Sequence, residues 1–214
     1  MRKLTSIGFW AMVVFSLIIA LSSYRFFLLG MEPAFEGLGA SVLDPRLPFI
    51  MHVVAAPLAL ATGSLQFFSN IRQKRPVLHR WNGRIYGLAV LFGGIAGLIM
   101  AVDATDRPMA AAGFGILAVI WLWFTASGVL HARAKRFDAH QAMMLRSFAL
   151  AFGAVTLRLQ LPFLMADGSS YLDVSHIVSW TAWVPNLIVV ELWLRRRQLG
   201  LAGQNIRDGA KSIA

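Results

Sequence analysis

The sequence contains no cysteine and has little charge. Without cysteine the chain has no disulfide, no thiolate metal site and no thiol nucleophile. Only 14% of the 214 residues are charged, against about 25% in soluble proteins, while 57% are hydrophobic. A phosphate-binding glycine loop, an HExxH zinc motif and a GxSxG nucleophile turn are also missing, which excludes the best-marked nucleotide-binding and hydrolytic chemistries. The remaining composition has too much apolar surface for a soluble domain.

The apolar residues form runs of about 20, the length that an α-helix needs to cross a bilayer. We therefore predict an all-α polytopic membrane protein, a bundle of six transmembrane helices. The first run is longer than the core of a signal peptide, and LSSYRFF lacks a small-x-small cleavage site, so we expect an anchor helix there. The predicted spans are 6–29, 48–69, 83–102, 109–130, 141–165 and 174–194, which form a single domain over 1–197 with a short flexible tail at 198–214.

The net charge of +10 is unevenly placed along the chain. Basic residues concentrate in the termini and in alternate connections, and the other connections are acidic. The positive-inside rule then predicts that both termini are cytoplasmic, in the inner membrane of a bacterium, with anionic headgroups as partners and no need for nucleic acid. The basic set is Arg2, Lys3, Arg72, Lys74, Arg75, Arg80, Arg84, Arg133, Lys135, Arg136, Arg195, Arg196, Arg197, Arg207 and Lys211, and the acidic set is Glu32, Glu36, Asp44, Asp103, Asp106, Asp167 and Asp173.

Five histidines lie near the ends of the predicted spans. His52 and His176 are placed near the external face, and His79, His131 and His140 near the cytoplasmic face. The N-terminal end of a helix favours the neutral imidazole, which is the form that ligates iron. Two such rings on facing helices can hold a haem from both sides. The pattern therefore predicts haem b between histidine pairs, as an electron path across the membrane.

The fifth predicted span is the most polar of the six. His140 and Arg158 are five helical turns apart and share a face, and Arg146 lies about 120° away. An arginine inside a span is by default a functional-site hypothesis. Its partner would be a haem propionate, a quinone or substrate oxygen, or a carboxylate such as Asp167 or Asp173. The alternative is that both arginines extend to the interface.

Small residues line one face of the second predicted span. Such a face admits either a planar ligand or a neighbouring helix, and helix packing is the stronger interpretation, as it is for the GGIAG motif of the third span. Near the end of the sixth span, Glu191 and Arg195 have the spacing of an ion pair within one helix. The stripe of the second span consists of His52, Ala56, Ala59, Gly63 and Gln66.

Two motifs resemble a known family. HRWNGRIYG at 79–87 and HQAMMLRSFALAFGAVTLR at 140–158, together with His52, Gly63 and Gln66, resemble the bacterial membrane family called domain of unknown function 2306, over about 50–160. The resemblance implies a multi-helix membrane protein without an assigned activity. The layout is also similar to the cytochrome b561 type, in which histidine pairs hold two haems. The positions that the first resemblance marks are His52, His79, Arg80, Gly83, His140, Arg146 and Arg158, whereas His131 and His176 fall outside the motifs.

The leading hypothesis is a haem b electron-transfer protein that exchanges electrons with a quinone or another redox partner. His79 and His140 would ligate the cytoplasmic haem, His52 with or without His176 the external one, and Arg80 and Arg146 would pair with propionates. The alternatives are a transporter or ligand binder, proton-linked or not, whose polar path includes Arg158, and a structural partner of a membrane complex. The candidate cofactor-binding residues are His52, Gln66, His79, Arg80, His140, Arg146, Arg158 and His176, and no catalytic residue is predicted.

Overall fold

The computed structural model describes residues 6–35 and 46–211, and every regular element in those ranges is an α-helix. Six helical segments are long and apolar enough to cross a membrane, so the prediction of a six-span all-α bundle is confirmed. The helices are α1 (Ser6–Ser23), α2 (Phe26–Leu29), α3 (Met31–Phe35), α5 (Arg46–Leu65), α6 (Ser69–Lys74), α7 (Pro76–Asp103), α8 (Pro108–Arg133), α9 (Phe137–Ala151), α10 (Gly153–Leu164), α11 (Tyr171–Thr181) and α12 (Val184–Lys211). The six spans are Ile7–Leu29, Leu47–Leu65, Pro76–Asp103, Pro108–Arg133, Phe137–Leu164 and Tyr171–Gly200.

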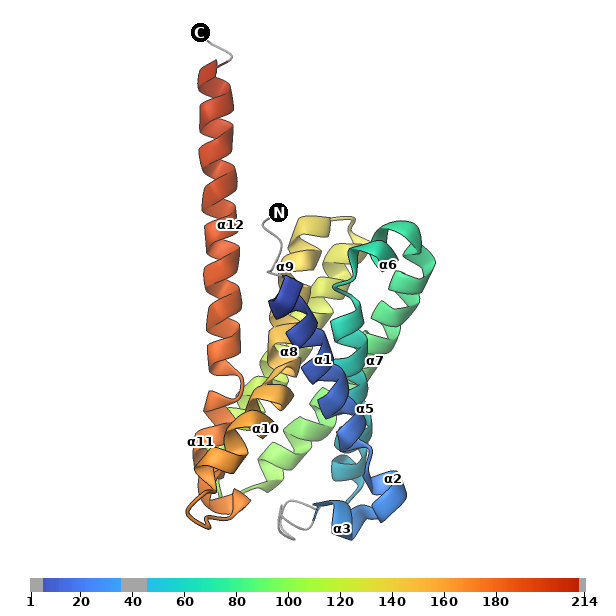
Figure 1. The fold of residues 1–214 in the computed structure, drawn as a ribbon, viewed down its shortest axis with the longest axis vertical. Coiled ribbons are helices and arrows are strands. Elements are labelled where there is room, and N and C mark those ends of the chain that lie inside the picture. Colours follow the sequence, from blue (N-terminus) through green and yellow to red (C-terminus); the bar gives the residue numbers. More distant parts are fainter. Residues whose placement is uncertain (1–5, 36–45, 212–214) are drawn as a thin grey trace.

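The bundle is built from sequential neighbours. Helix α5 packs on α7, α7 on α8, α8 on α9, and α9 on α12, while α1 lies on α5 and also contacts α10. The two chain ends lie toward the same end of the bundle, together with α6 and the start of α9, and α2 and α3 lie at the opposite end (Figure 1). Helix α12 extends beyond the other helices (Figure 1) and continues through 198–211, where the sequence predicts a tail.

The third span begins earlier than hydropathy predicts, at Pro76 rather than at residue 83. Proline suits the first turn of a helix, because the N–H that it lacks would have no partner there. The polar residues that follow belong to the helix even though they lower its hydropathy. As a result His79 and Arg80 lie on α7 itself, one turn from its start.

The fifth and sixth spans are each interrupted. Helix α9 gives way to α10 at Phe152, and α11 gives way to α12 at Ala182 and Trp183. Pro185 accounts for the second interruption, because proline has no N–H for the carbonyl of Thr181. The two interruptions contact each other: a Cβ added at Gly153 would lie 3.3 Å from the carbonyl oxygen of Ala182. The prediction of one continuous fifth helix is therefore corrected to two shorter helices.

Asn186 connects the two interrupted spans. Its Nδ2 donates to the carbonyl of Ala182 at 3.1 Å and to the Thr156 hydroxyl at 3.0 Å, and it lies 3.4 Å from the carbonyl of Ala149. Its Oδ1 accepts from Thr156 at 3.2 Å. A backbone group without a partner costs several kcal/mol in a bilayer. One amide side chain thus donates to carbonyls of both interrupted spans, Ala149 of the fifth and Ala182 of the sixth.

Close helix packing uses the small residues of the second and third spans. A Cβ on Gly63 would lie 2.7 Å from the rings of both Tyr86 and Phe148, and a Cβ on Gly93 would lie 3.3 Å from the Ala56 nitrogen. Ala59 is fully buried. The interpretation of these small residues as packing faces is confirmed.

A chain of hydroxyl groups joins three helices in the core. Thr125 donates to the carbonyl of Trp121 at 2.8 Å, and its Oγ1 lies 2.6 Å from the Ser147 hydroxyl. Ser147 in turn lies 2.6 Å from the Tyr86 hydroxyl. Since each hydroxyl has one proton, the chain runs from Tyr86 through Ser147 and Thr125 to Trp121. These fully or nearly buried groups are paired with one another and fix α7, α8 and α9 in register.

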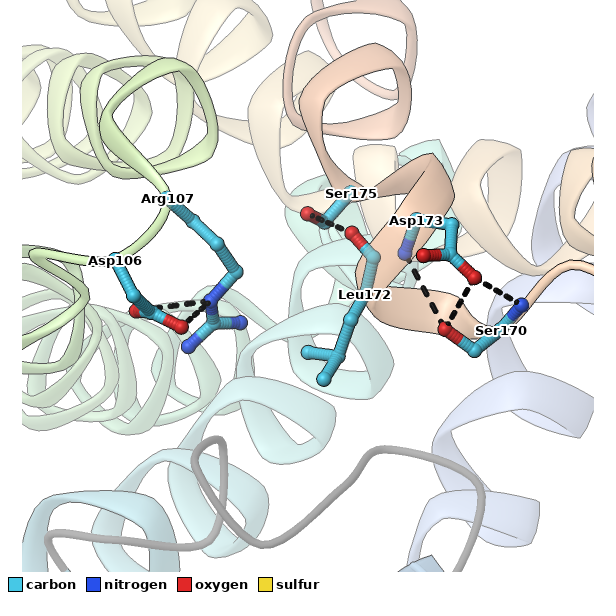
Figure 2. Close-up of polar contacts among 6 residues, drawn as sticks. All are labelled: Asp106, Arg107, Ser170, Leu172, Asp173 and Ser175. Carbon is cyan, nitrogen blue, oxygen red and sulfur yellow. Dashed lines mark hydrogen bonds and ion pairs between the residues drawn. The ribbon is translucent and has the colours of Figure 1, made fainter.

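The connections at the end opposite the termini carry local polar contacts. Figure 2 shows the capping box that starts α11, in which Asp173 Oδ2 accepts from the Ser170 backbone at 2.8 Å and the Ser170 hydroxyl accepts from the Asp173 backbone at 3.3 Å. The same view shows Arg107 beside Asp106, 3.1 Å apart, between α7 and α8. The connection between the first two predicted spans contains α3, and residues 36–45 lie outside the described residues.

Replacing Asn186 with alanine should weaken the bundle. The carbonyls of Ala182 and Ala149 would lose their side-chain donor, at a cost of about 1–2 kcal/mol in the free energy of unfolding. The measurement is unfolding of the purified protein in mixed micelles. Ile188→Ala, on the exposed side of α12, is the matched control, and an equal loss in both variants would contradict the role of Asn186.

Candidate functional site

The carbonyl of Gly93 fixes the ring of His52. His52 on α5 places Nδ1 2.9 Å from the carbonyl oxygen of Gly93 on α7. A carbonyl only accepts hydrogen bonds, so Nδ1 carries the ring proton and Nε2 keeps a lone pair. A Cβ at Gly97, one turn further along α7, would lie only 3.2 Å from this Nδ1. The two glycines therefore make the room that the imidazole occupies.

Arg158 on α10 lies inside a span and is bound by neutral groups. Its Nη1 donates to the carbonyl of Ala154 at 3.1 Å, and its Nη2 donates to the Ser23 hydroxyl of α1 at 3.0 Å. Among the side chains that the structure describes, which do not include that of Glu32 on α3, no carboxylate lies within 4.0 Å of its guanidinium. A guanidinium has five N–H donors. In Arg158, acceptors among the described residues bind Nη1 and Nη2. The expected pairing with Asp167 or Asp173 is not formed, because both of these side chains bond to residues of their own turn.

His52 and Arg158 line one small cavity. The cavity has a volume of about 70 Å³, and its polar wall consists of Ser23, His52 and Arg158. Since one water takes about 30 Å³ in the liquid, the space holds a group of only a few atoms. The remaining walls are apolar and come from α1, α3, α5 and α10, including Phe35 and Leu60. We call this space the His52–Arg158 cavity.

A second arginine adds positive charge near this cavity. Arg25, between α1 and α2, donates to the carbonyl of Ala34, and its guanidinium lies 5.3 Å from the centre of the Phe35 ring. Arg25 is near enough for its charge to act on Arg158. The local electrostatics therefore favour an anion.

His79 and His140 lie at the opposite end of the bundle, on α7 and α9. His140 Nδ1 lies 2.8 Å from the carbonyl of Gly128 on α8, so its ring is fixed in the same way as that of His52. His79 Nδ1 is buried and has no hydrogen-bond partner among the described residues. His79 lies in the first turn of α7 and His140 in the first turn of α9, at the same end of the bundle (Figure 1).

Gln66 supports the backbone of this end of the bundle. Its Nε2 donates to the carbonyl of His79 at 3.2 Å, and Asn82 donates to the carbonyl of Thr62 at 2.8 Å. Both bonds join the end of α5 to the start of α7. Gln66 is therefore engaged with the chain itself.

Arg146 forms an ion pair with Glu191. Its Nε donates to Glu191 Oε1, and its Nη2 donates to Oε2 at 2.9 Å, a two-point contact between α9 and α12. The predicted pairing of Glu191 with Arg195 is corrected to this contact between helices. A haem propionate would have to displace the carboxylate before it could bind Arg146.

His176 joins neither group, and Arg80 directly follows His79 on α7. His176 is exposed on α11 and is absent from the walls of the His52–Arg158 cavity. Arg80 is exposed on α7. The expected pairing of His52 with His176 is therefore not formed, because α11 turns His176 away from the side that packs on the bundle.

Haem does not fit beside His52. A volume of about 70 Å³ is well below the roughly 300–1,000 Å³ of a typical ligand pocket. Within the described residues there is also no group of three or more His, Asp or Glu that could hold a metal ion. A larger cavity of about 360 Å³ lies between α7 and α8, but apolar residues and one glycine line it. Neither of these two cavities is lined by His79 or His140.

The roles of two residues in these sites were not predicted from the sequence. Ser23 in the first span accepts from Arg158, although the two are far apart in the chain. Glu191 was assigned to the wrong partner. The sequence does contain a signal for this pair. A cation inside a span needs a counter-charge. Glu191 is the one carboxylate within the sixth span beyond its first turn, which makes it the natural partner for an arginine in another span.

Comparison with known proteins identifies the family. The family model described as "Predicted membrane protein (DUF2306)" matches residues 49–194, so the chain belongs to this family. The match extends beyond the two motifs that carried the resemblance and includes the interrupted fifth span and most of the sixth. No curated protein and no solved structure matches the chain.

Neutralising one member of the Arg146–Glu191 pair should destabilise the protein more than neutralising both. The side chains are 18% and 33% exposed, so a partner left alone keeps a largely desolvated charge. We expect Arg146→Gln or Glu191→Gln to cost about 1–3 kcal/mol, and the double variant to recover most of that loss. Unfolding of the four proteins in mixed micelles gives the coupling free energy. Additive losses would show that the contact is not an energetic pair.

Proposed function

We propose that this member of the DUF2306 family binds a small anion in the His52–Arg158 cavity. The observation that carries the proposal is a guanidinium inside a span whose acceptors, among the side chains and backbone that the structure describes, are two neutral oxygens. The side chain of Glu32 on α3 is not among those described. Arginines at membrane depth are costly, and they typically mark ligand paths or pair with other groups. An anion in the cavity would supply the counter-charge that Arg158 lacks there.

The donor set suits an oxyanion such as a carboxylate. Guanidinium N–H groups bind carboxylate oxygens in a planar two-point geometry. The guanidinium donors of Arg158 that have no acceptor among the described side chains, together with the small volume of the cavity, favour a headgroup of a few atoms. The apolar walls, which include Phe35 and Leu60, suit a short hydrocarbon part beside the headgroup.

The distribution of charged residues between the two ends of the bundle supports a cellular location and a membrane orientation for the protein. The end of the bundle that carries α6 and both termini is rich in arginine and lysine, whereas the loops at the other end carry Asp103, Asp106 and Asp167. The positive-inside rule then supports a bacterial inner-membrane protein with cytoplasmic termini and anionic lipid at that face. In this orientation the His52–Arg158 cavity lies in the external half.

Arg158→Gln should abolish anion binding. The neutral amide keeps a similar polar shape but removes the charge and most of the donors, so we expect the affinity to fall by at least about tenfold. The probe is trifluoroacetate, titrated into the protein in lipid nanodiscs and followed by line broadening in fluorine NMR. Arg158→Lys keeps the charge without the planar fork and should bind with intermediate affinity.

Two controls make this test specific. Arg84→Gln removes an exposed arginine at the opposite end of the bundle and should leave binding unchanged. Glu32→Gln, Glu36→Gln and Asp44→Asn remove three acidic side chains that the structure does not describe, and stronger binding in any of them would identify an internal competitor for Arg158. If wild type and Arg158→Gln respond alike to trifluoroacetate, the proposed function is wrong.

A second candidate function is electron transfer through haem b at the cytoplasmic pair. It is favoured by the bond from His140 Nδ1 to the carbonyl of Gly128 and by the buried, unpaired Nδ1 of His79 among the described residues. Histidines that ligate metals usually donate their other ring N–H in this way, which fixes the tautomer. His79 and His140 would be the axial ligands, and a quinone or another redox partner would exchange electrons with the iron.

An absorption spectrum tests this second function. The protein is purified in mild detergent from haem-supplemented cells and measured oxidised and after dithionite reduction. The haem hypothesis predicts a Soret band that changes on reduction and is lost in His79→Ala and His140→Ala, while His176→Ala retains it. A folded protein without the band would exclude this function and leave the anion-binding proposal untouched.

A further inference from the structure

The His52–Arg158 cavity contains a base as well as a cation. The Gly93 carbonyl holds the proton of His52 on Nδ1, so Nε2 is the nitrogen that can take up another proton. His52 and Arg158 line the same cavity of about 70 Å³. Any ligand in so small a space is close to both groups.

The charged and titratable groups around His52 can be named for each helix packed on it. From α10 the group is Arg158, which lines the same cavity, while Arg25 at the α1–α2 junction lies outside its walls. Tyr24 donates its hydroxyl to the carbonyl of Val54 and is thereby engaged. Helix α7 places the Gly93 carbonyl and Gly97 against this ring. Among the described side chains, the charge beside His52 is therefore positive.

We propose that the His52–Arg158 cavity binds one anion together with one proton, and that the proton resides on His52 Nε2. This inference rests on the proposed function and names the proton as the second ligand of the same site. In the empty cavity a protonated His52 would lie beside the positive Arg158 without an anion between them. Coulomb repulsion between the two cations therefore opposes protonation of His52. A bound anion reverses the balance, because it lies between the two groups and attracts both.

The coupling also lowers the cost of bringing an anion into the membrane. A charge in a low-dielectric site is expensive unless it is compensated nearby. An anion and a proton that bind together add no net charge to the span. Linkage requires the reciprocal effect, so lower pH strengthens anion binding and the anion strengthens proton binding by the same factor.

The test measures the pH dependence of trifluoroacetate binding. The probe is the anion of a strong acid and remains ionised throughout, so any pH dependence belongs to the protein. For wild type in nanodiscs we expect the dissociation constant to rise between about pH 5 and 8, by up to about tenfold per pH unit. In His52→Gln the same titration should be flat. His176→Gln, which changes an exposed histidine away from the cavity, should keep the slope of the wild type.

Proton uptake by the wild-type protein provides a second, independent measurement. Addition of trifluoroacetate to a weakly buffered sample should remove protons from solution, approaching one proton per bound anion, as reported by a pH indicator. Binding without uptake and with a flat pH profile would overturn the proton coupling while leaving anion binding intact. A pH slope that persists in His52→Gln would also overturn it, and an absence of binding at every pH would instead contradict the proposed function itself.

Discussion

A guanidinium placed in the hydrocarbon region of a bilayer needs a compensating partner, and this requirement organises the two ends of the fifth span. Arg146 meets it with the carboxylate of Glu191, so the ion pair joins α9 to α12. Arg158 meets it, among the described residues, with a backbone carbonyl and the Ser23 hydroxyl. One arginine is neutralised by the fold, and the other is solvated by neutral groups at the wall of a cavity. This difference separates a structural arginine from a candidate ligand-binding one.

The helices around the cavity are positioned by small residues and by interruptions. Gly93 and Gly97 let α5 approach α7 closely enough for the His52 ring to reach a backbone carbonyl. The interruption at Phe152 separates α10, which carries Arg158, from α9, and Asn186 satisfies carbonyls on both sides of the contact between the spans. Backbone carbonyls that would be costly in lipid thereby gain side-chain partners within the chain.

Hydropathy and helical periodicity were sufficient for the number of spans, the all-helical class and the packing role of Gly63, because these depend on local composition. The partner of Arg146 could not be predicted, because it depends on how α12 is rotated against α9. The same limit explains His176, which has a suitable depth along its helix but lies on the exposed side. The start of α7 at Pro76 was missed because its first turns are polar, although proline at that position indicates a helix start.

The most direct test of the central claim is the anomalous diffraction of crystals grown with bromide as the anion. The account predicts a bromine peak in the His52–Arg158 cavity, within about 3.5 Å of a guanidinium nitrogen, and no such peak in Arg158→Gln. A cavity without bromide, in which a carboxylate of this chain such as Glu36 or Asp44 instead contacts Arg158, would contradict it. In that case the second arginine of the fifth span would be neutralised by the fold, as the first one is.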